Sequence, residues 1–279
     1  MIEILLAILG ISFILIVHEL GHFFFAKKFG VSVLEFGVGL PPRILKKKIK
    51  GTIFSLNLIP MGAFVRLEGE EKIESPCSFL SKPRWQRLAI ILGGVSFGWV
   101  FSWILIWIIG TFSYIEGFNF PDSLVKERII LEDNVQLQRV KFDFLQSPFQ
   151  SLFFTSYLTF NLTISLGNTL KHLILKRELP PGVEIEGPVK IVALSKNIIS
   201  NFGLSKFLYF LSILSLYLSI LNLLPIPVVD GGRAFFILSE MLLKKEIPRP
   251  ILERSILISF LLLFFLFILV TIYDIKELI

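Results

Sequence analysis

The sequence His18-Glu19-Leu20-Gly21-His22 places two histidines four residues apart inside a long apolar run. An α-helix makes one turn in 3.6 residues, so the two imidazoles lie on one face, one above the other. Two imidazoles in this position can bind one metal ion, and Glu19 can reach a water molecule on it. Two buried core histidines are the weaker interpretation, because polar side chains inside an apolar helix are costly unless something compensates them.

Two such ligands and an intervening carboxylate are the arrangement found in zinc hydrolases. We therefore predict Zn²⁺ as the cofactor, His18 and His22 as metal ligands, and Glu19 as the general base. The chain contains only three histidines, which makes a chance occurrence of this pattern rare.

The composition is that of a membrane protein. Of the 279 residues, 54% are hydrophobic and the mean hydropathy is +0.75, whereas soluble domains are nearer 45–50% apolar. We assign the net charge of +6 to loops facing the cytoplasm, so no nucleic-acid partner is expected. Cys77 is the single cysteine, which excludes an intrachain disulfide and a cysteine-based zinc site.

We predict one domain over 1–279, an α-helical polytopic membrane protein with about four transmembrane helices. Apolar runs of about 20 residues or more are long enough to cross the bilayer. A small membrane-associated β-region and an extra non-spanning helix complete the prediction. The predicted spans are about 4–26, 85–112, 204–224 and 256–273. The β-region covers 31–66, with strands at 31–39 and 52–60 and an exposed turn from Pro41 to Lys50. Residues 113–202 are predicted as an outer loop with a surface helix at 149–175.

The distribution of basic residues predicts the orientation. Segment 27–87 holds twelve Lys and Arg in about 60 residues, whereas 113–202 holds nine in 90. The positive-inside rule then places the end of the first span in the cytoplasm and both termini outside. We expect a multi-pass protein of the bacterial cytoplasmic (inner) membrane with its active site towards the cytoplasmic side.

A catalytic zinc ion needs a third protein ligand and an open position for water. Asp230 is the best candidate, because it follows the helix-breaking sequence Pro225-Ile226-Pro227 and lies in an apolar region that offers a carboxylate few other partners. The alternative interpretation of Asp230 is a helix cap. His172 lies in the outer segment, on the wrong side of the membrane for the site. Asp230 reaches the depth of the histidines only if 149–175 does not span.

Two long motifs in this order resemble the site-2 protease family of zinc intramembrane metalloproteases. The second motif runs from Asn222 through Pro225 and Pro227 to Asp230, with Val229 where the family has Leu. Shorter likenesses are Pro60-Met61-Gly62-Ala63-Phe64-Val65-Arg66, which resembles the membrane-associated β-region, and Gly187-Pro188-Val189, which resembles a motif before the third span. The resemblance implies cleavage of single-span proteins, such as anti-sigma factors or signal-peptide remnants, usually after a first cut outside the membrane.

Substrate contacts follow from the need to unwind a transmembrane helix whose amides are all satisfied. Strands in 52–66 can pair with an extended substrate, and Asn222 can bind its backbone. We predict substrate-binding residues at Gly62, Phe64, Asn222, Pro225 and Pro227.

The sequence departs from the family in two places. Only about 35 residues separate the second span from Phe149, so we expect no PDZ domain there. Gly98 stands where the second span usually carries Asn. Two competing functions stay open: a catalytically inactive relative that binds membrane proteins, and a transporter with an ion site at the broken third helix. The intact Glu19 argues against the first, and the lack of inverted repeats against the second.

Overall fold

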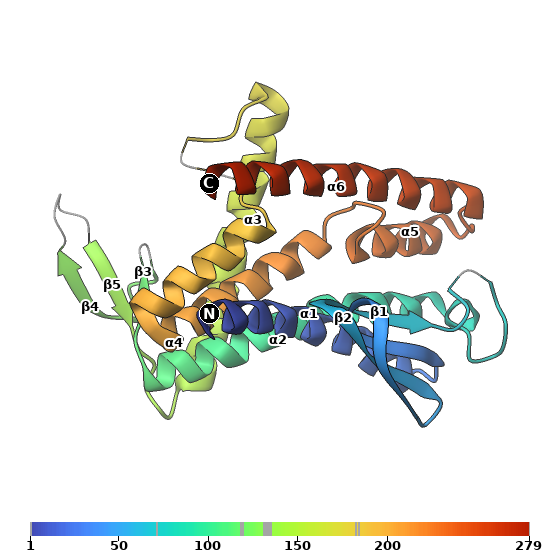
Figure 1. The fold of residues 1–279 in the computed structure, drawn as a ribbon, viewed down its shortest axis with the longest axis horizontal. Helices are drawn as coiled ribbons and strands as arrows, with labels where there is room; N and C mark the ends of the chain where they lie inside the picture. Colours follow the sequence, from blue (N-terminus) through green and yellow to red (C-terminus); the bar gives the residue numbers. More distant parts are fainter. Residues whose placement is uncertain are drawn as a thin grey trace.

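The computed structural model describes residues 2–278 except 71, 118–119, 131–135, 182 and 184. Four of its helices are long and apolar enough to cross a membrane (Figure 1). They confirm a helical polytopic membrane protein. Three of the predicted spans fall within these helices, and the prediction 204–224 overlaps the third helix, which ends at Asn222. These helices are α1 (Ile2–Lys28), α2 (Arg84–Phe112), α4 (Pro188–Asn222) and α6 (Arg249–Leu278).

Helices α1 and α2 cross in direct backbone contact, which small residues make possible. A Cβ on Gly21 would lie 2.1 Å from the carbonyl oxygen of Gly93, so neither position admits a side chain without movement. Serine hydroxyls hold α2 to α4: Ser102 donates to the carbonyl of Ser212 at 2.6 Å, and Ser215 donates to the carbonyl of Gly98 at 3.0 Å. In lipid the hydrophobic effect does not drive helices together, so close packing and interhelical hydrogen bonds of this kind stabilise their association.

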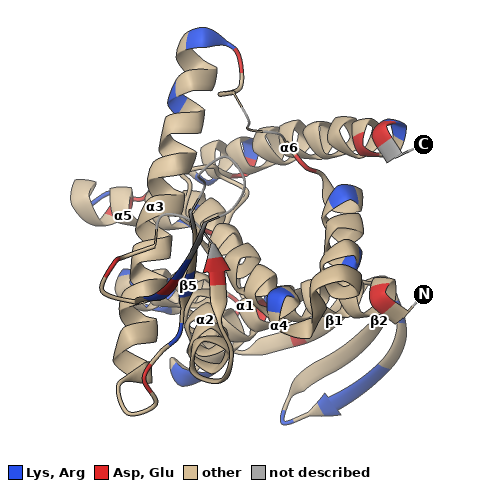
Figure 2. Cartoon of the chain, turned by 90° about the vertical axis from the view of Figure 1, so that its left-hand side faces the viewer, with Lys and Arg blue, Asp and Glu red and all other residues tan. Residues whose placement is uncertain are grey.

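Helix α3 (Ser147–Lys176) runs crosswise to α2 in both Figure 1 and Figure 2, and is not among the four candidate spans. Three indole groups of α2 reach its polar face. Trp99 donates to Thr159 at 3.0 Å, Trp103 to Ser151 at 3.0 Å and Trp107 to Ser147 at 2.9 Å. Ser147, Ser151 and Thr159 therefore bond to α2, whereas Ser156, Thr163 and Ser165 of the same helix are exposed.

The segment between α2 and α3 contains a three-stranded sheet where the sequence predicted only a loop. Its strands β3 (Ile115–Gly117), β4 (Val125–Ile130) and β5 (Gln136–Val140) have the order β3-β5-β4. The sheet is anchored by a shared core, in which buried Ile115, Val140 and Phe142 pack with Phe154 of α3. Short strands with mixed polarity gave too weak a pattern to be identified.

Strands β1 (Val33–Ile49) and β2 (Thr52–Leu67) form a long hairpin that folds back on itself. Phe36 lies opposite both Val65 and Phe54. The order across this sheet is therefore 43–49, 52–57, 35–38 and 63–67. Its turn is Lys50-Gly51, with φ of 45° and 86°, the left-handed pair that a two-residue hairpin needs.

The predicted exposed turn from Pro41 to Lys50 is therefore wrong, because most of that segment is strand. Its lysines lie along an edge of the sheet instead of in a loop. The hairpin also contacts α1, where the hydroxyl of Ser12 donates to the carbonyl of Pro60 at 2.6 Å.

The third candidate span is longer than predicted. Helix α4 begins at Pro188, and Gly203 interrupts it with a non-helical φ of 79°. Residues 188–202, predicted as loop, are thus helical. Helix α5 (Asp230–Leu243) follows the proline-containing break, and α6 is tied back to the start of α4 by buried Asp274. Its carboxylate accepts hydrogen bonds from the backbone N–H groups of Gly187 and Lys190, both at 3.0 Å.

Candidate metal centre

Three metal-ligating atoms converge from segments 212 residues apart in the chain. His18 Nε2 lies 3.0 Å from Asp230 Oδ2, and His22 Nε2 lies 3.3 Å from the same oxygen. The two Nε2 atoms are 3.3 Å apart. The structure thus brings together the two histidines of α1 and the aspartate at the first position of α5, as the sequence predicted.

The donor set fits zinc. Four ligands arranged tetrahedrally at 2.0–2.1 Å from a zinc ion are about 3.3 Å from one another. The observed separations are close to this value, and two imidazole nitrogens with one carboxylate oxygen leave a fourth position open. These are the residues that would hold the ion.

Glu19 is the other acidic group of the cluster, with a carboxylate oxygen within 4.8 Å of the histidine nitrogens. Asp230 Oδ2 lies within hydrogen-bond distance of both rings, so Asp230 suits the role of ligand and Glu19 is left for the role of base. The backbone of Val65 in β2 faces the Glu19 carboxylate. The edge segment 63–67 of the hairpin therefore borders the site.

The ring of His22 is held by a second hydrogen bond. Its Nδ1 lies 2.9 Å from the carbonyl oxygen of Ile90 in α2. A carbonyl can only accept, so Nδ1 carries the proton and Nε2 presents a lone pair to the cluster. His18 Nδ1 is buried and has no hydrogen-bond partner among the described residues.

Gly94 of α2 leaves room for the two imidazoles. A Cβ at this position would lie 2.5 Å from His22 Nε2 and 2.6 Å from His18 Nε2. One turn further along α2, a Cβ on Gly98 would lie 2.5 Å from the hydroxyl of Ser219, a buried group without a described hydrogen-bond partner. Gly98, which departs from the family pattern, thus faces a serine of α4.

The loop between α4 and α5 explains the two glycines after Asp230. Prolines 225 and 227 end the helix, and the chain folds tightly over the start of α5. A Cβ on Gly231 would lie 2.3 Å from the backbone of Leu223, and one on Gly232 would lie 2.1 Å from the carbonyl oxygen of Ile226. The Gly-Gly pair therefore permits the turn that brings Asp230 to the histidines.

The predicted substrate-binding residues lie in two segments, one that leads to Val65 and one that leads to Asp230. Gly62, with φ of 94°, and Phe64 precede Val65 on β2, and the Phe64 ring packs over Gly37. Asn222 is the last residue of α4 and is partly exposed. His172 lies on an exposed part of α3, as expected of a surface residue.

The sequence did not identify Ile90 and Val65 as parts of the site. Both act through backbone groups, which every residue type offers, so their identity gives no indication of this role. Gly93-Gly94 was the one available signal, since a glycine pair indicates close approach of another backbone.

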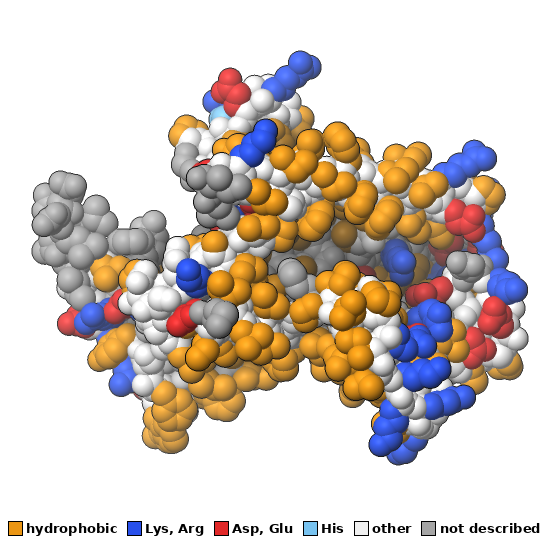
Figure 3. Space-filling model, in the orientation of Figure 1, with side chains coloured by type: hydrophobic (Ala, Val, Ile, Leu, Met, Phe, Trp, Pro, Cys, Tyr) orange, Lys and Arg blue, Asp and Glu red, His pale blue; other side chains and the backbone are white. Residues whose placement is uncertain are grey.

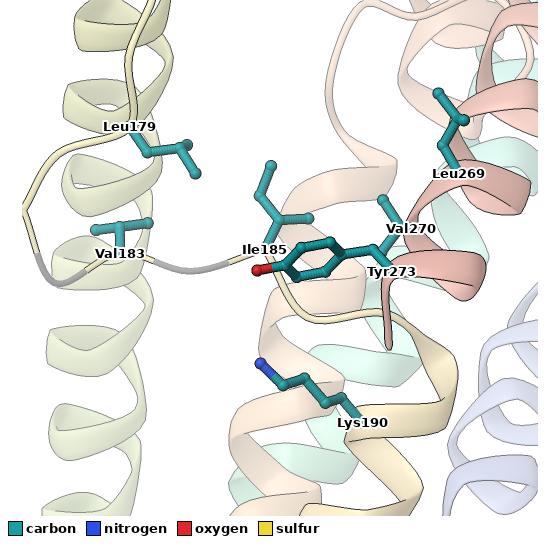
Figure 4. Close-up of a pocket in the computed structure, with 7 residues that line it drawn as sticks. All are labelled: Leu179, Val183, Ile185, Lys190, Leu269, Val270 and Tyr273. Carbon is teal, nitrogen blue, oxygen red and sulfur yellow. The ribbon is translucent and has the colours of Figure 1, made fainter. Parts of the chain in front are cut away.

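A separate apolar pocket of about 440 Å³ lies between the segment before α4 and helix α6 (Figure 4). It shares no residue with the metal cluster. Its lining is Leu179, Val183, Ile185, Lys190, Leu269, Val270 and Tyr273.

Comparison with known proteins identifies relatives over nearly the whole chain. The model of Peptidase family M50 matches residues 6–266. A protein of Clostridium perfringens, whose name assigns it provisionally as a zinc metalloprotease, is 28% identical, with 98% of each chain covered. A Campylobacter jejuni protein with the same provisional name is also 28% identical, over 100% of this chain and 94% of its own. In Thermotoga maritima a protein so named is 45% identical over 96 residues, which are 32% of this chain and 19% of that one.

Proposed function

We propose that this chain, which belongs to peptidase family M50, cuts transmembrane segments of single-span proteins within the membrane. Membership in the family makes it a membrane-bound, zinc-dependent metalloprotease. The observation that carries the finer proposal is the convergence of His18, His22 and Asp230 beside Glu19, between helices apolar enough to cross a bilayer.

The residues of the cluster have two different roles in peptide hydrolysis, metal binding and proton transfer. Zinc held by His18, His22 and Asp230 would polarise the scissile carbonyl and acidify the attacking water. Glu19 accepts a proton from that water and passes it to the leaving amine as the C–N bond breaks. The backbone of Val65, which faces the Glu19 carboxylate, is placed to orient it.

An extended substrate needs new partners for its backbone, because unwinding a helix in lipid frees its amides. The edge of the hairpin that borders Glu19 supplies such partners by pairing with the substrate as an added strand. Gly62 and Phe64 lie on this edge, and Asn222, Pro225 and Pro227 form the broken helix end that follows α4. These five residues are our candidates for substrate contact.

The proposed substrates are anti-sigma factors or signal-peptide remnants, which share a single apolar span. We place the protein in the bacterial cytoplasmic membrane, with both termini outside and the metal cluster towards the cytoplasmic side. The support is the concentration of Lys and Arg in 27–87, between the first two candidate spans.

The test is cleavage of a model single-span substrate by purified protein, comparing wild type with Glu19→Gln. We expect zinc content to stay the same and cleavage to fall by at least 100-fold, because the base is lost while the ligands remain. Glu253→Gln, the same change on an exposed part of α6, is the control and keeps activity.

Three other results would refute parts of the proposal. Equal cleavage by wild type and Glu19→Gln would remove Glu19 from the chemistry. Failure of folded wild type to retain zinc would disprove the metal site and revive the transporter interpretation. If the protein retained zinc but cleaved no single-span substrate, the alternative function of a catalytically inactive protein that binds membrane proteins would be favoured.

A further inference from the structure

We propose that the hairpin β1–β2 binds an anionic phospholipid of the membrane surface. The acyl chain lies in an apolar groove on the sheet, and the phosphate lies beside Lys46 and Lys47. This binding goes beyond the proposed proteolysis and does not depend on it.

Almost all the net charge of the protein lies on this hairpin. Segment 33–67 contains six basic residues and one acidic residue, a net charge of +5 against +6 for the whole chain. The acidic residue, Glu35, is buried and paired with Arg43 at 2.6 Å and Arg66 at 3.6 Å. It therefore does not neutralise the lysines further along β1.

Four lysines of the hairpin are exposed and available to an anion. In the part of the chain that the structure describes, no ion pair involves Lys46, Lys47, Lys48 or Lys50. Figure 2 shows these positions as a blue strand extending from the helices, and Figure 3 shows basic groups gathered at the same end. A cluster of lysines next to a membrane attracts anionic lipid headgroups.

An apolar groove of about 530 Å³ runs beside the lysines. Aromatic and aliphatic side chains from both strands line it, and Lys46 and Lys47 are part of its wall. The remaining lining residues are Phe36, Val38, Leu45, Phe54, Ser55 and Leu56. An apolar groove with cations on its wall matches a lipid with an anionic headgroup, because the acyl chain packs against the apolar side chains and the headgroup pairs with the lysines.

The hairpin also exposes large apolar side chains beyond the groove. Ile44 is 54% exposed, Leu58 59% and Ile59 45%. Since β1 begins five residues after α1 ends, the hairpin starts at the surface where that candidate span terminates. Lysines on an edge strand can also serve only to prevent sheet-to-sheet association, but that role does not explain the apolar groove beside them.

The lipid site and the metal cluster lie at opposite edges of one sheet. Strand segment 43–49 carries the lysines, and segment 63–67 reaches Glu19 through Val65.

The experiment measures binding of short-chain phosphatidylglycerol and phosphatidylcholine to the full chain in neutral detergent by native mass spectrometry. We expect one saturable phosphatidylglycerol site and at least tenfold weaker binding of phosphatidylcholine. At about fivefold per lysine, the triple variant Lys46→Gln, Lys47→Gln, Lys48→Gln loses about 100-fold in phosphatidylglycerol affinity. Leu56→Ser weakens binding of both lipids, because it removes part of the groove.

A matched triple variant at exposed lysines elsewhere, Lys171→Gln, Lys176→Gln, Lys244→Gln, keeps wild-type binding if the site is the hairpin. Unchanged binding in the hairpin variant, an equal loss in the matched variant, or equal affinity for the two lipids would overturn the proposal. Displacement of the lipid by polyglutamate at equal concentration would assign the lysines to an acidic peptide instead. Glu19→Gln binds lipid like wild type, so loss of cleavage and loss of lipid binding are told apart.

Discussion

Replacing Gly94 with alanine tests the metal cluster without touching a proposed ligand. The added methyl carbon would lie 2.5 Å and 2.6 Å from the two histidine Nε2 atoms, whereas ordinary van der Waals contacts are 3.4–4 Å. An ion bonded to both nitrogens at 2.0–2.1 Å would stand within about 3 Å of that carbon. The methyl group and the ion therefore compete for the same space.

The cost of this change can be estimated from the packing around the rings. His22 is held by the Ile90 carbonyl at 2.9 Å, and both rings contact Asp230, so neither can turn away freely. Overpacking of a closely packed site costs about 1–3 kcal/mol. That range corresponds to a loss of about 5- to 150-fold in zinc affinity.

The assay is zinc content of the purified variant after equilibration with a competing chelator, together with its thermal unfolding temperature. Gly98→Ala is the matched control on the same helix. Its methyl group would clash only with the Ser219 hydroxyl at 2.5 Å, the end of a short side chain that can rotate, and would make ordinary contacts with Ser215 at 3.5 and 3.8 Å. Zinc affinity should therefore be retained. Gly167→Ala adds a methyl group with nothing within 4 Å and controls for helix propensity.

Wild-type zinc affinity in a folded Gly94→Ala variant would refute the reasoning. It would mean that the ion does not lie between His18 and His22 as the structure places them. Loss of zinc in Gly98→Ala as well would indicate that any change in α2 disturbs the helix packing, and the steric argument would fail.

Two further predictions concern Asp274 of α6 and Glu35 of the hairpin. Asp274→Ala removes the hydrogen bonds that this buried carboxylate accepts from Gly187 and Lys190, each contributing about 1.5–3 kcal/mol. Helix α6 should therefore become sensitive to proteolysis, whereas the exposed control Tyr273→Phe leaves it protected. Burial acts to raise the pKa of Glu35, but its hydrogen bonds lower it by more, so the pKa lies below the ordinary 4.5. The ionised Glu35 therefore stabilises the folded hairpin above pH 4.5, and this stabilisation is lost as the pH falls through the lowered pKa of the folded state. The unfolding temperatures of wild type and Glu35→Gln should converge at low pH. A difference in unfolding temperature that stays constant with pH would contradict the stabilising role of the Glu35 carboxylate.

The chemistry of the site could be predicted because it is marked by particular residue types only a few positions apart in the sequence. Two histidines and a glutamate within one turn of helix indicate a metal and a base, whatever the rest of the fold. Asp230 required more, since nothing local links it to α1. It was found because a carboxylate after a proline-broken helix in an apolar region needs a cation, and because counting spans placed it at the depth of the histidines.

The hairpin could not be predicted correctly because its register depends on tertiary packing. Pro41-Pro42 and four nearby lysines are typical of a turn, yet the chain continues as strand to Ile49 and turns at Gly51. The segment pairs along β2, while Phe23 of α1 packs on Phe36 and Phe54 of the sheet. Contacts with partners distant in sequence decide such cases, and local patterns do not contain them.

Helix α2 supplies no metal ligand, yet it positions all of them. Its Ile90 carbonyl orients His22, its Gly93 and Gly94 let α1 approach, and its Arg87 pairs with Glu240 at 3.3 Å. That last contact holds the far part of α5, so Asp230 at the start of α5 is directed to the histidines. Motif residues therefore identify the ligands, but the geometry of the site rests on a helix whose sequence signal is a pair of glycines.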